Sequence, residues 1–185
     1  MKYALMIFAV IIAVALVGCS NKNGNNLNPV DPAVSSLAKM GNNMKSSSNF
    51  QAHLNGATML PPNSSIAQGE AIFSLSKDSS SIHYKLIVAN IDDVFMAHIH
   101  IGGSATTKGK IAVWLYGDQS NPPSGLIPGR FDGTLAEGTI TDADLTGPMA
   151  DSTITDLVHE FMKGDAYVIV HTTQNPGGEI RGHIQ

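Results

Sequence analysis

The sequence predicts an all-β domain, built as a Greek-key-like antiparallel β-sandwich with one or two short helices. Three observations support this fold class. Apolar and polar residues alternate in several short runs, these runs are rich in β-branched and aromatic residues, and clusters of Gly, Pro, Asn, Asp and Ser separate them. No motif repeats at a fixed period, which argues against a solenoid.

The expected strands follow one another through the second part of the chain. In the first strand Phe50, Ala52 and Leu54 alternate with polar residues, which places these three side chains on one face. Residues 77–80 form a turn between two later strands. The complete set of expected strands is 50–55, 71–76, 82–88, 99–101, 111–116, 131–135, 167–172 and 179–184.

Two stretches have helical signals instead. Residues 141–145 begin like a capped turn. Residues 153–163 make the better helix, because Thr153 or Thr155 can cap its start and Gly164 follows as a stop signal. The spacing of three apolar residues in this helix predicts one buried face, formed by Leu157, Val158 and Phe161.

The N-terminus carries signals of export and lipid attachment. Lys2 is followed by an apolar run that ends at Val17, and Cys19 stands two residues further on. This order resembles the bacterial lipobox, which implies removal of a signal peptide at 1–18 and attachment of lipid, such as palmitate, to Cys19. An uncleaved transmembrane anchor is the alternative, although the run is shorter than the roughly 20 residues that a span needs.

The lipid on Cys19 would hold the protein on a membrane of the cell envelope. Ser20 is not an Asp, so the outer membrane is the expected location in a bacterium with two membranes. Residues 19–49, rich in Asn, Ser, Gly and Lys, are expected to be a flexible tether because they cannot bury enough apolar surface to offset the entropy of ordering. Residues 50–185 suffice for one domain with one core.

Composition narrows the chemistry that the domain can perform. Cys19 is the only cysteine, so the exported part has no disulfide and no thiolate, and a metal site has to use His, Asp, Glu or carbonyl oxygen. The formal net charge is -4 and only 14% of the residues are charged. This balance argues against nucleic acid as a partner, because such proteins carry a basic surface.

Two histidines in the run AHIHIGG, at 97–103, are the strongest candidates for a functional site. Side chains two apart in a strand point to the same face, so His98 and His100 project together, with Cα atoms about 6.5–7 Å apart. His171 ends another β-rich run and is the expected third ligand. Three imidazoles suit Zn²⁺ or Cu²⁺. Possible additional ligands are His183, Glu179 and His53.

A hydrogen-bond network without metal is the alternative for these histidines. A buried His can donate one ring N–H to a backbone carbonyl and accept a hydrogen bond at its other nitrogen. Such a network can hold neighbouring strands in register. It predicts that each of the three histidines pairs with a carbonyl or a carboxylate, and that they lie too far apart to share an ion.

Several motifs resemble those of the CHRD (chordin-type) domain, and the resemblance extends over essentially all of 50–185. The matching motifs are LNGA at 54–57 with Pro61-Pro62 after it, AHIH at 97–100, GKIAV at 109–113 and YVIVHTTQNPGGEIRG at 167–182. The resemblance implies an all-β extracellular module. Bacterial members are typically exported proteins without an assigned reaction, and animal members belong to a secreted protein that binds signalling ligands.

The His-x-His pair also resembles the copper-binding strand of copper/zinc superoxide dismutases, which are β-sandwiches, as immunoglobulin domains are. The chain departs from that family because it lacks the cysteine pair and has no histidine between Gly102 and Arg130. Three functions therefore stay open. The first is a lipid-anchored, non-catalytic module that binds an envelope protein, a glycan or another copy of itself; the second is a metal-binding lipoprotein; the third and weakest is a dismutase-like redox enzyme.

Overall fold

The computed structural model describes residues 48–103, 107–117 and 125–185 of the 185-residue chain. The expected signal peptide, Cys19 and all but the last two residues of the expected tether lie outside the described residues. Within the described ranges, no helix has both the length and the apolar character needed to cross a bilayer.

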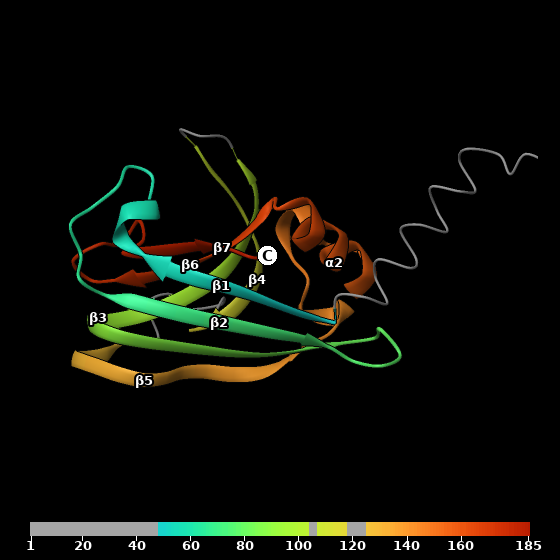
Figure 1. The fold of residues 1–185 in the computed structure, drawn as a ribbon, viewed down its shortest axis with the longest axis horizontal. Helices are drawn as coiled ribbons and strands as arrows, with labels where there is room; N and C mark the ends of the chain where they lie inside the picture. Colours follow the sequence, from blue (N-terminus) through green and yellow to red (C-terminus); the bar gives the residue numbers. More distant parts are fainter. Residues whose placement is uncertain (1–47, 104–106, 118–124) are drawn as a thin grey trace, which may run out of the picture. The chain divides into compact units, whose positions relative to one another are not determined.

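The described chain is mostly β-strand, with one α-helix and three short 3₁₀ turns (Figure 1). The strands are β1 (Asn49–Asn55), β2 (Gln68–Leu75), β3 (Ile82–Gly103), β4 (Lys108–Tyr116), β5 (Ile127–Ile140), β6 (Ala166–Thr172) and β7 (Ile180–His183). The other elements are η1 (Gly56–Thr58), η2 (Asp142–Asp144), η3 (Gly147–Met149) and α2 (Ile154–Lys163). The predicted all-β class is thereby confirmed.

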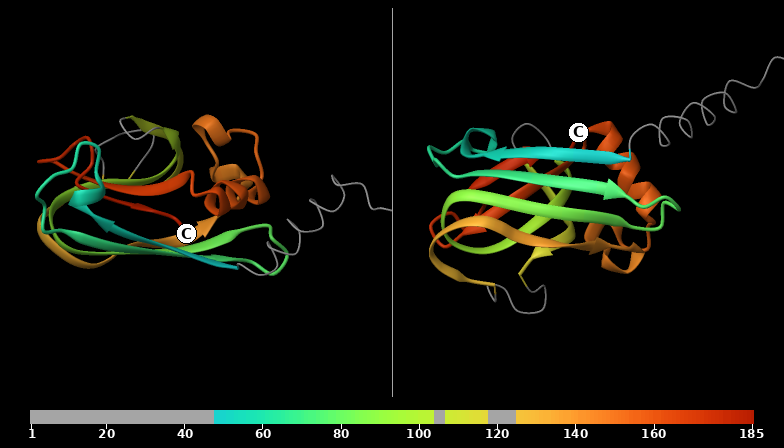
Figure 2. Two further views of the ribbon diagram at one scale, coloured as in Figure 1. Left: turned by 45° about the horizontal axis from the view of Figure 1, so that its top comes forward. Right: turned by 60° about the horizontal axis from the view of Figure 1, so that its bottom comes forward.

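The seven strands form one antiparallel sheet that closes on itself like a barrel (Figure 2). Closure depends on β3, whose first half pairs with β2 and β5 and whose second half pairs with β6 and β4. The ring continues from β6 to β7, β1 and β2. The finer prediction of a two-sheet Greek-key sandwich is not confirmed, because hydrogen bonds join all seven strands into one sheet, in which β3 pairs with strands on both sides of the closure.

The prediction of separate strands at 82–88 and 99–101 was wrong, since both belong to the 22-residue strand β3. Between them the strand bends. Asn90 and Asp93 have φ values of 57° and 52°, and the pairing with β5 shifts register on both sides of Ile91. Asp and Asn tolerate this left-handed backbone better than other residues with a side chain. Residues 89–93, where polar residues interrupt the alternating pattern, therefore bend the strand instead of ending it.

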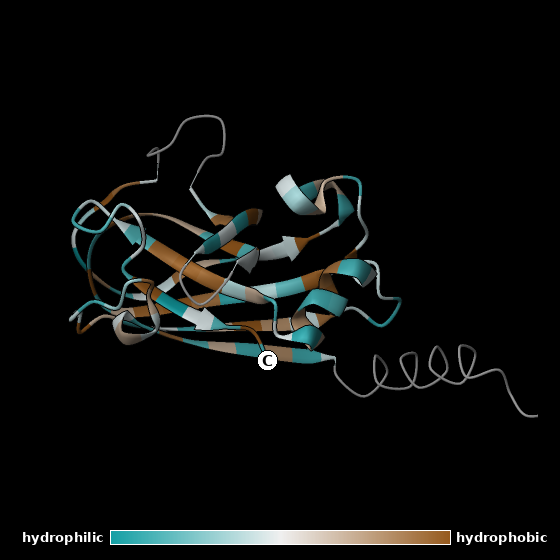
Figure 3. Cartoon of the chain, turned by 90° about the horizontal axis from the view of Figure 1, so that it is seen from above, coloured by the Kyte–Doolittle hydropathy of each residue, from teal (hydrophilic) through white to brown (hydrophobic). Residues whose placement is uncertain are grey.

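The main core lies inside the closed sheet and extends to α2. Phe161 of α2 contacts Phe50 of β1 and Phe73 of β2, each with ring centroids 5.4 Å apart. Ile154, Leu157 and Val158 are buried on the same face of the helix. Figure 3 shows apolar segments along the strands and alternating colours on α2, as expected for elements with one buried face.

The helix begins and ends as its sequence predicts. Thr153 accepts a hydrogen bond from the Asp156 N–H, while the Asp156 carboxylate accepts one from the Thr153 N–H, which makes a capping box. Gly164 ends the helix with φ of 75°, a left-handed conformation that favours glycine. The expected capped turn at 141–145 is the 3₁₀ turn η2, with Thr141 paired to Asp144.

Candidate metal centre

The register of β3 against β6 brings the candidate histidines together. His98 lies opposite Ile169, His100 opposite Tyr167 and Met96 opposite His171. Residues opposite each other in a sheet share a face, so His98, His100 and His171 lie on the same side of these two strands. The intervening residues Ala97, Ile99, Val168 and Val170 belong to the main core on the other side.

Their ring nitrogens lie close enough to converge on one ion. One nitrogen from each of His98, His100 and His171 lies within 4.8 Å of the others. His98 Nδ1 and His171 Nε2 are 3.3 Å apart. Two nitrogens bound to tetrahedral Zn²⁺ at about 2.0–2.1 Å are separated by about 3.3 Å. The distance between these two nitrogens therefore matches the distance expected for a shared metal ion.

Backbone carbonyls fix the tautomers of two of these rings. His171 Nδ1–H donates to the Pro176 carbonyl at 3.0 Å, and His100 Nδ1–H donates to the Gly109 carbonyl at 3.1 Å. Because a carbonyl only accepts, both Nδ1 atoms carry the proton and both Nε2 atoms keep a lone pair. Outer hydrogen bonds of this kind orient ligand histidines in metal sites.

The cluster is almost fully buried and, among the described residues, leaves two nitrogens without a partner. His98 is fully buried, and His100 and His171 are each 6% exposed. His98 Nε2 and His100 Nε2 are buried and have no hydrogen-bond partner among the described residues. A buried polar atom left unpaired costs about 1–3 kcal/mol. A metal-free network accordingly satisfies only part of this cluster.

Burial keeps the three imidazoles neutral. Desolvation lowers the pKa of His98 to about 3, with a further contribution from His171 and His100. Desolvation also lowers the pKa of His171 to about 4, partly opposed by its hydrogen bond to Pro176. The pKa of His100 is lowered by desolvation as well. Neutral imidazole is the form that binds a metal, so the ligands are ready at neutral pH.

Aromatic rings form the walls of the cluster. Trp114 of β4 contacts His98 edge to face, with ring centroids 4.1 Å apart. Tyr167 stacks on His100 with centroids 5.4 Å apart and an angle of 7° between the rings. The Tyr167 hydroxyl accepts a hydrogen bond from the Gly109 N–H. Tyr167 thus holds both His100 and the residue whose carbonyl fixes its tautomer.

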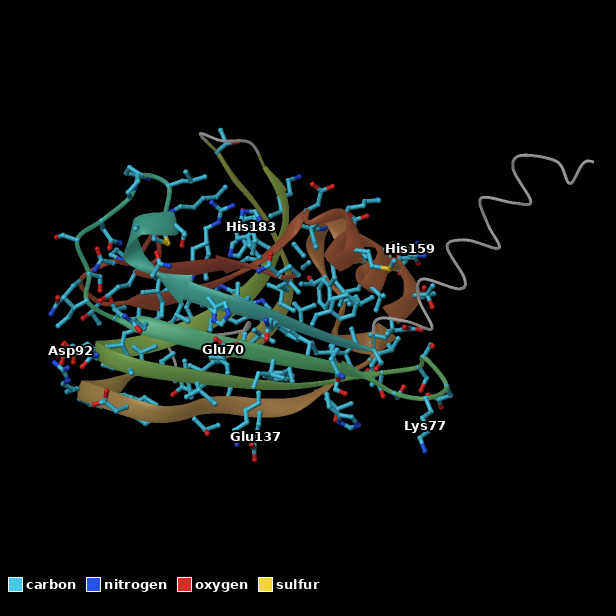
Figure 4. All side chains as sticks on the ribbon, viewed as in Figure 1. Glu70, Lys77, Asp92, Glu137, His159 and His183 are labelled. Atoms are coloured by element: carbon cyan, nitrogen blue, oxygen red, sulfur yellow. The ribbon has the colours of Figure 1, made fainter. Side chains whose placement is uncertain are left out.

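Two other candidate histidines lie outside the cluster. His183 Nε2 accepts a hydrogen bond from Arg181 Nη2 at 3.1 Å, and its Nδ1–H donates to the Gly164 carbonyl at 3.2 Å, so neither nitrogen is available for a metal. His53 pairs with Glu70 at the β1–β2 surface and its side chain is 65% exposed. Figure 4 shows His183 beside β7 and Glu70, the partner of His53, on the β2 side of the barrel.

Glu179 also lies outside the cluster, in a network of its own. Its carboxylate accepts hydrogen bonds from the Ser65 and Thr172 hydroxyls, each at 2.6 Å, and from the Asn175 amide at 3.2 Å. The Glu179 side chain is therefore committed to joining the 172–179 turn to the segment around Ser65. The physical reason is burial, since a carboxylate only 8% exposed needs donors around it.

The sequence reasoning missed the residues that surround the histidines. Tyr167 could have been found, because it is four residues before His171 in the same strand and thus lies on the same face. Gly109, Pro176 and Trp114 carried no such signal. The first two contribute backbone carbonyls, and all three reach the cluster through strand register and turn geometry that the sequence pattern does not specify.

This arrangement can bind one transition-metal ion and leave part of its coordination open. Three neutral imidazoles supply three ligands, whereas Zn²⁺ usually has four. Within residues 48–103, 107–117 and 125–185, the histidine triad is the only group of three or more His, Cys, Asp or Glu placed to hold a metal. The described domain therefore has one such candidate centre.

Comparison with known proteins gives the family. The CHRD domain family model matches residues 50–184. Chordin of Xenopus laevis and chordin of Danio rerio are each 30% identical to the chain over 135 residues, which is 71% of this chain and 12% of either chordin. The chain therefore spans only a small part of the curated relatives that it matches. From residue 50 to residue 184, the chain belongs to the CHRD domain family.

Proposed function

We propose that this CHRD-domain protein binds one Zn²⁺ or Cu²⁺ ion through His98, His100 and His171. The observation that carries the proposal is the 3.3 Å separation of His98 Nδ1 and His171 Nε2, with His100 in the same group. His171 Nε2 and His100 Nε2 are the ligand atoms, because hydrogen bonds to carbonyls occupy the other nitrogens. For His98 the ligand atom is Nδ1.

The unpaired nitrogens favour metal over a metal-free network. Without metal, His98 Nδ1–H would donate to His171 Nε2, which leaves His98 Nε2 and His100 Nε2 as buried lone pairs with no donor among the described residues. With metal, His100 Nε2 gains a ligand bond, and His98, whose ring packs against Trp114, carries its proton on Nε2. The metal thus satisfies at least one nitrogen that the network leaves unpaired.

The proposed role is capture or storage of the ion, without turnover. A dismutase-like site would need a second group of His and Asp ligands beside the first. The described residues offer a single group of metal-binding side chains, the triad itself. A non-catalytic role is also consistent with membership of the CHRD family.

We further propose that lipid on Cys19 attaches the protein to the cell envelope. The apolar run before Cys19 and the tether after it support this location. Replacement of Cys19 by Ser should move the protein from the membrane fraction to the soluble fraction and remove the lipid mass. Retention of the Cys19→Ser variant in membranes would instead favour an uncleaved anchor.

Metal analysis of the full chain, purified with a histidine-free affinity tag, tests the central proposal. One equivalent of Zn²⁺ or Cu²⁺ should remain bound after gel filtration, and His98→Ala should abolish it. His53→Ala is the matched control, because it also removes one imidazole but from the exposed surface. Equal metal content in all three proteins would refute the assignment.

A polar pocket supports a second candidate function, recognition of an envelope glycan or protein. The pocket, of about 360 Å³, lies beside the bend of β3, and Figure 4 shows Asp92 at the end of the barrel away from α2. Amide and charged side chains suited to hydroxyl groups line it, among them Asn63, Asn90, Asp92, Arg130 and Gln174. Loss of envelope-polysaccharide binding in Asp92→Ala, with metal binding intact, would support this role.

A further inference from the structure

Lys108 lies beside both backbone segments whose carbonyls hold the metal-binding rings. It directly precedes Gly109, whose carbonyl accepts the His100 proton. Its ammonium donates to the carbonyl of Gly177, which directly follows Pro176, whose carbonyl accepts the His171 proton. The Lys108 charge accordingly lies near both rings, and it lowers the pKa of both His100 and His171.

A second cation lies behind His100. Arg181 is 7% exposed, and its guanidinium lies 3.9 Å from the centroid of the Tyr167 ring that stacks on His100. Arg181 donates to the Thr58 carbonyl and to His183, and its Nε finds no partner within the described ranges. Among the described residues, no carboxylate forms an ion pair with Arg181 or Lys108.

The proposed centre therefore has an excess of positive charge. Its three ligands are neutral, its neighbour Arg181 is a buried cation, and a bound divalent ion would add two more positive charges, while the exposed Lys108 contributes a further positive charge from the surface. Charges held away from water need a counter-ion. The three imidazoles also leave a fourth coordination position open, and an anion in that position would meet both requirements.

We propose that the metal-loaded centre binds a small inorganic anion, such as a halide, azide or hydroxide, as its fourth ligand, and that Lys108 holds this anion. The inference rests on the proposed metal site. Among the described residues, the hydrogen-bond partner of the Lys108 ammonium is the Gly177 carbonyl, and an ammonium has two further N–H donors and its full charge to offer an exogenous anion. Lys108 is exposed, so a small anion can approach it from solvent.

Azide titration of the Cu²⁺-loaded full chain tests the inference, with the azide-to-copper charge-transfer absorption as the readout. The wild-type chain should bind azide, and Lys108→Met should weaken that binding roughly ten- to a hundredfold, the effect of losing one hydrogen bond to a charged group. Lys110→Met is the matched control, because it removes the same charge from the same strand and should leave azide affinity unchanged. Lys108→Arg should retain most of the affinity.

The copper content of each protein, measured before the titration, separates the two proposals. A wild-type chain that binds no copper refutes the metal site itself. A copper-loaded chain that binds no azide overturns the anion site but not the metal site. Equal azide affinity in wild type and Lys108→Met overturns the role of Lys108. As a second measurement, azide should raise the copper affinity of the wild-type chain by the same factor by which copper raises azide affinity. If Lys108→Met loses copper, the absence of this reciprocal effect in the wild type overturns the inference.

Discussion

His98 and His171 face each other across neighbouring strands, with Nδ1 of the first 3.3 Å from Nε2 of the second. This distance suits either a hydrogen bond or a shared metal ion. The two explanations differ in what the remaining nitrogens do, because His98 Nε2 and His100 Nε2 have no partner in the part of the chain that the structure describes. Measurements of stability and metal affinity on single variants distinguish a site that exists for a ligand from a network that exists for stability.

Replacement of His98 by Leu should abolish metal binding with little change in the stability of the metal-free domain. Leu has a similar volume and no polar atom, so it removes the unpaired His98 Nε2 but leaves His171 Nε2 without its donor, and these opposing effects should change the free energy of unfolding by less than about 1 kcal/mol. Urea denaturation in the presence of a chelator measures this change. A loss of more than about 1 kcal/mol would instead indicate that His98 belongs to a structural hydrogen-bond network.

The metal-free domain should lose stability as the pH falls from about 6.5 to 5. Burial lowers the pKa of His98 to about 3 and of His171 to about 4, whereas unfolded His has a pKa of about 6.5. In this window the unfolded state binds more protons, so the free energy of unfolding decreases with falling pH. The slope should approach about 1.4 kcal/mol per pH unit for each histidine. Denaturant titrations at pH 7, 6 and 5 give the slope.

The control for this pH effect is the His98→Leu variant. It removes one of the shifted groups, so its stability should fall less steeply between pH 6.5 and 5. Carboxylates contribute little in this range because they titrate mainly at lower pH. Parallel curves for the variant and the wild type would show that His98 is protonated in the folded domain.

Glu179→Ala should destabilise the domain by about 3 kcal/mol. The change leaves the buried Thr172 hydroxyl and the Ser65 and Asn175 donors without their acceptor. Because Asn175 and Pro176 lie in one turn, the same change should also weaken metal binding through His171. Glu137→Ala is the control, since its pair with Lys85 is exposed and should contribute less than about 1 kcal/mol. Similar unfolding midpoints for both variants would contradict this role of Glu179.

Tyr167→Phe should weaken metal binding about tenfold, in line with other residues that orient metal ligands. The change keeps the ring that stacks on His100 but removes the hydroxyl that accepts the Gly109 N–H. Isothermal titration with Zn²⁺ measures the affinity. Tyr84→Phe is a suitable control, because its hydroxyl bonds to the Leu115 carbonyl away from the histidines. Unchanged zinc affinity in Tyr167→Phe would mean that Gly109 is held in place without it.

The local features of this fold could be predicted from the sequence, and the long-range ones could not. Alternation located the strands, and Thr153 and Gly164 marked both ends of α2, because these signals act within a few residues. At the bend in β3 the sequence predicts two strands instead of one, because Asn and Asp, which occupy positions 90 and 93, are also typical of loops. Closure of the sheet through β3 depends on pairing between distant segments, which the alternation of residues does not encode.

The same limit applies to the candidate site. His98 and His100 could be placed on one face from their spacing, and His171 could be named as a partner. The positions of Lys108, Arg181 and Glu179 relative to the histidines could not be predicted, because turns and register shifts bring them there. Glu179 and His183 were considered as ligands for this reason, although hydrogen bonds occupy both.

X-ray absorption at the zinc edge of the Zn²⁺-loaded full chain measures the coordination shell of the proposed centre. We expect one bound ion with three imidazole nitrogens at about 2.0–2.1 Å and a fourth ligand that is water or an anion. His98→Ala should lose this spectrum, whereas His53→Ala should keep it. A shell made mainly of oxygen atoms, or the same imidazole signal in His98→Ala, would contradict a metal centre formed by His98, His100 and His171.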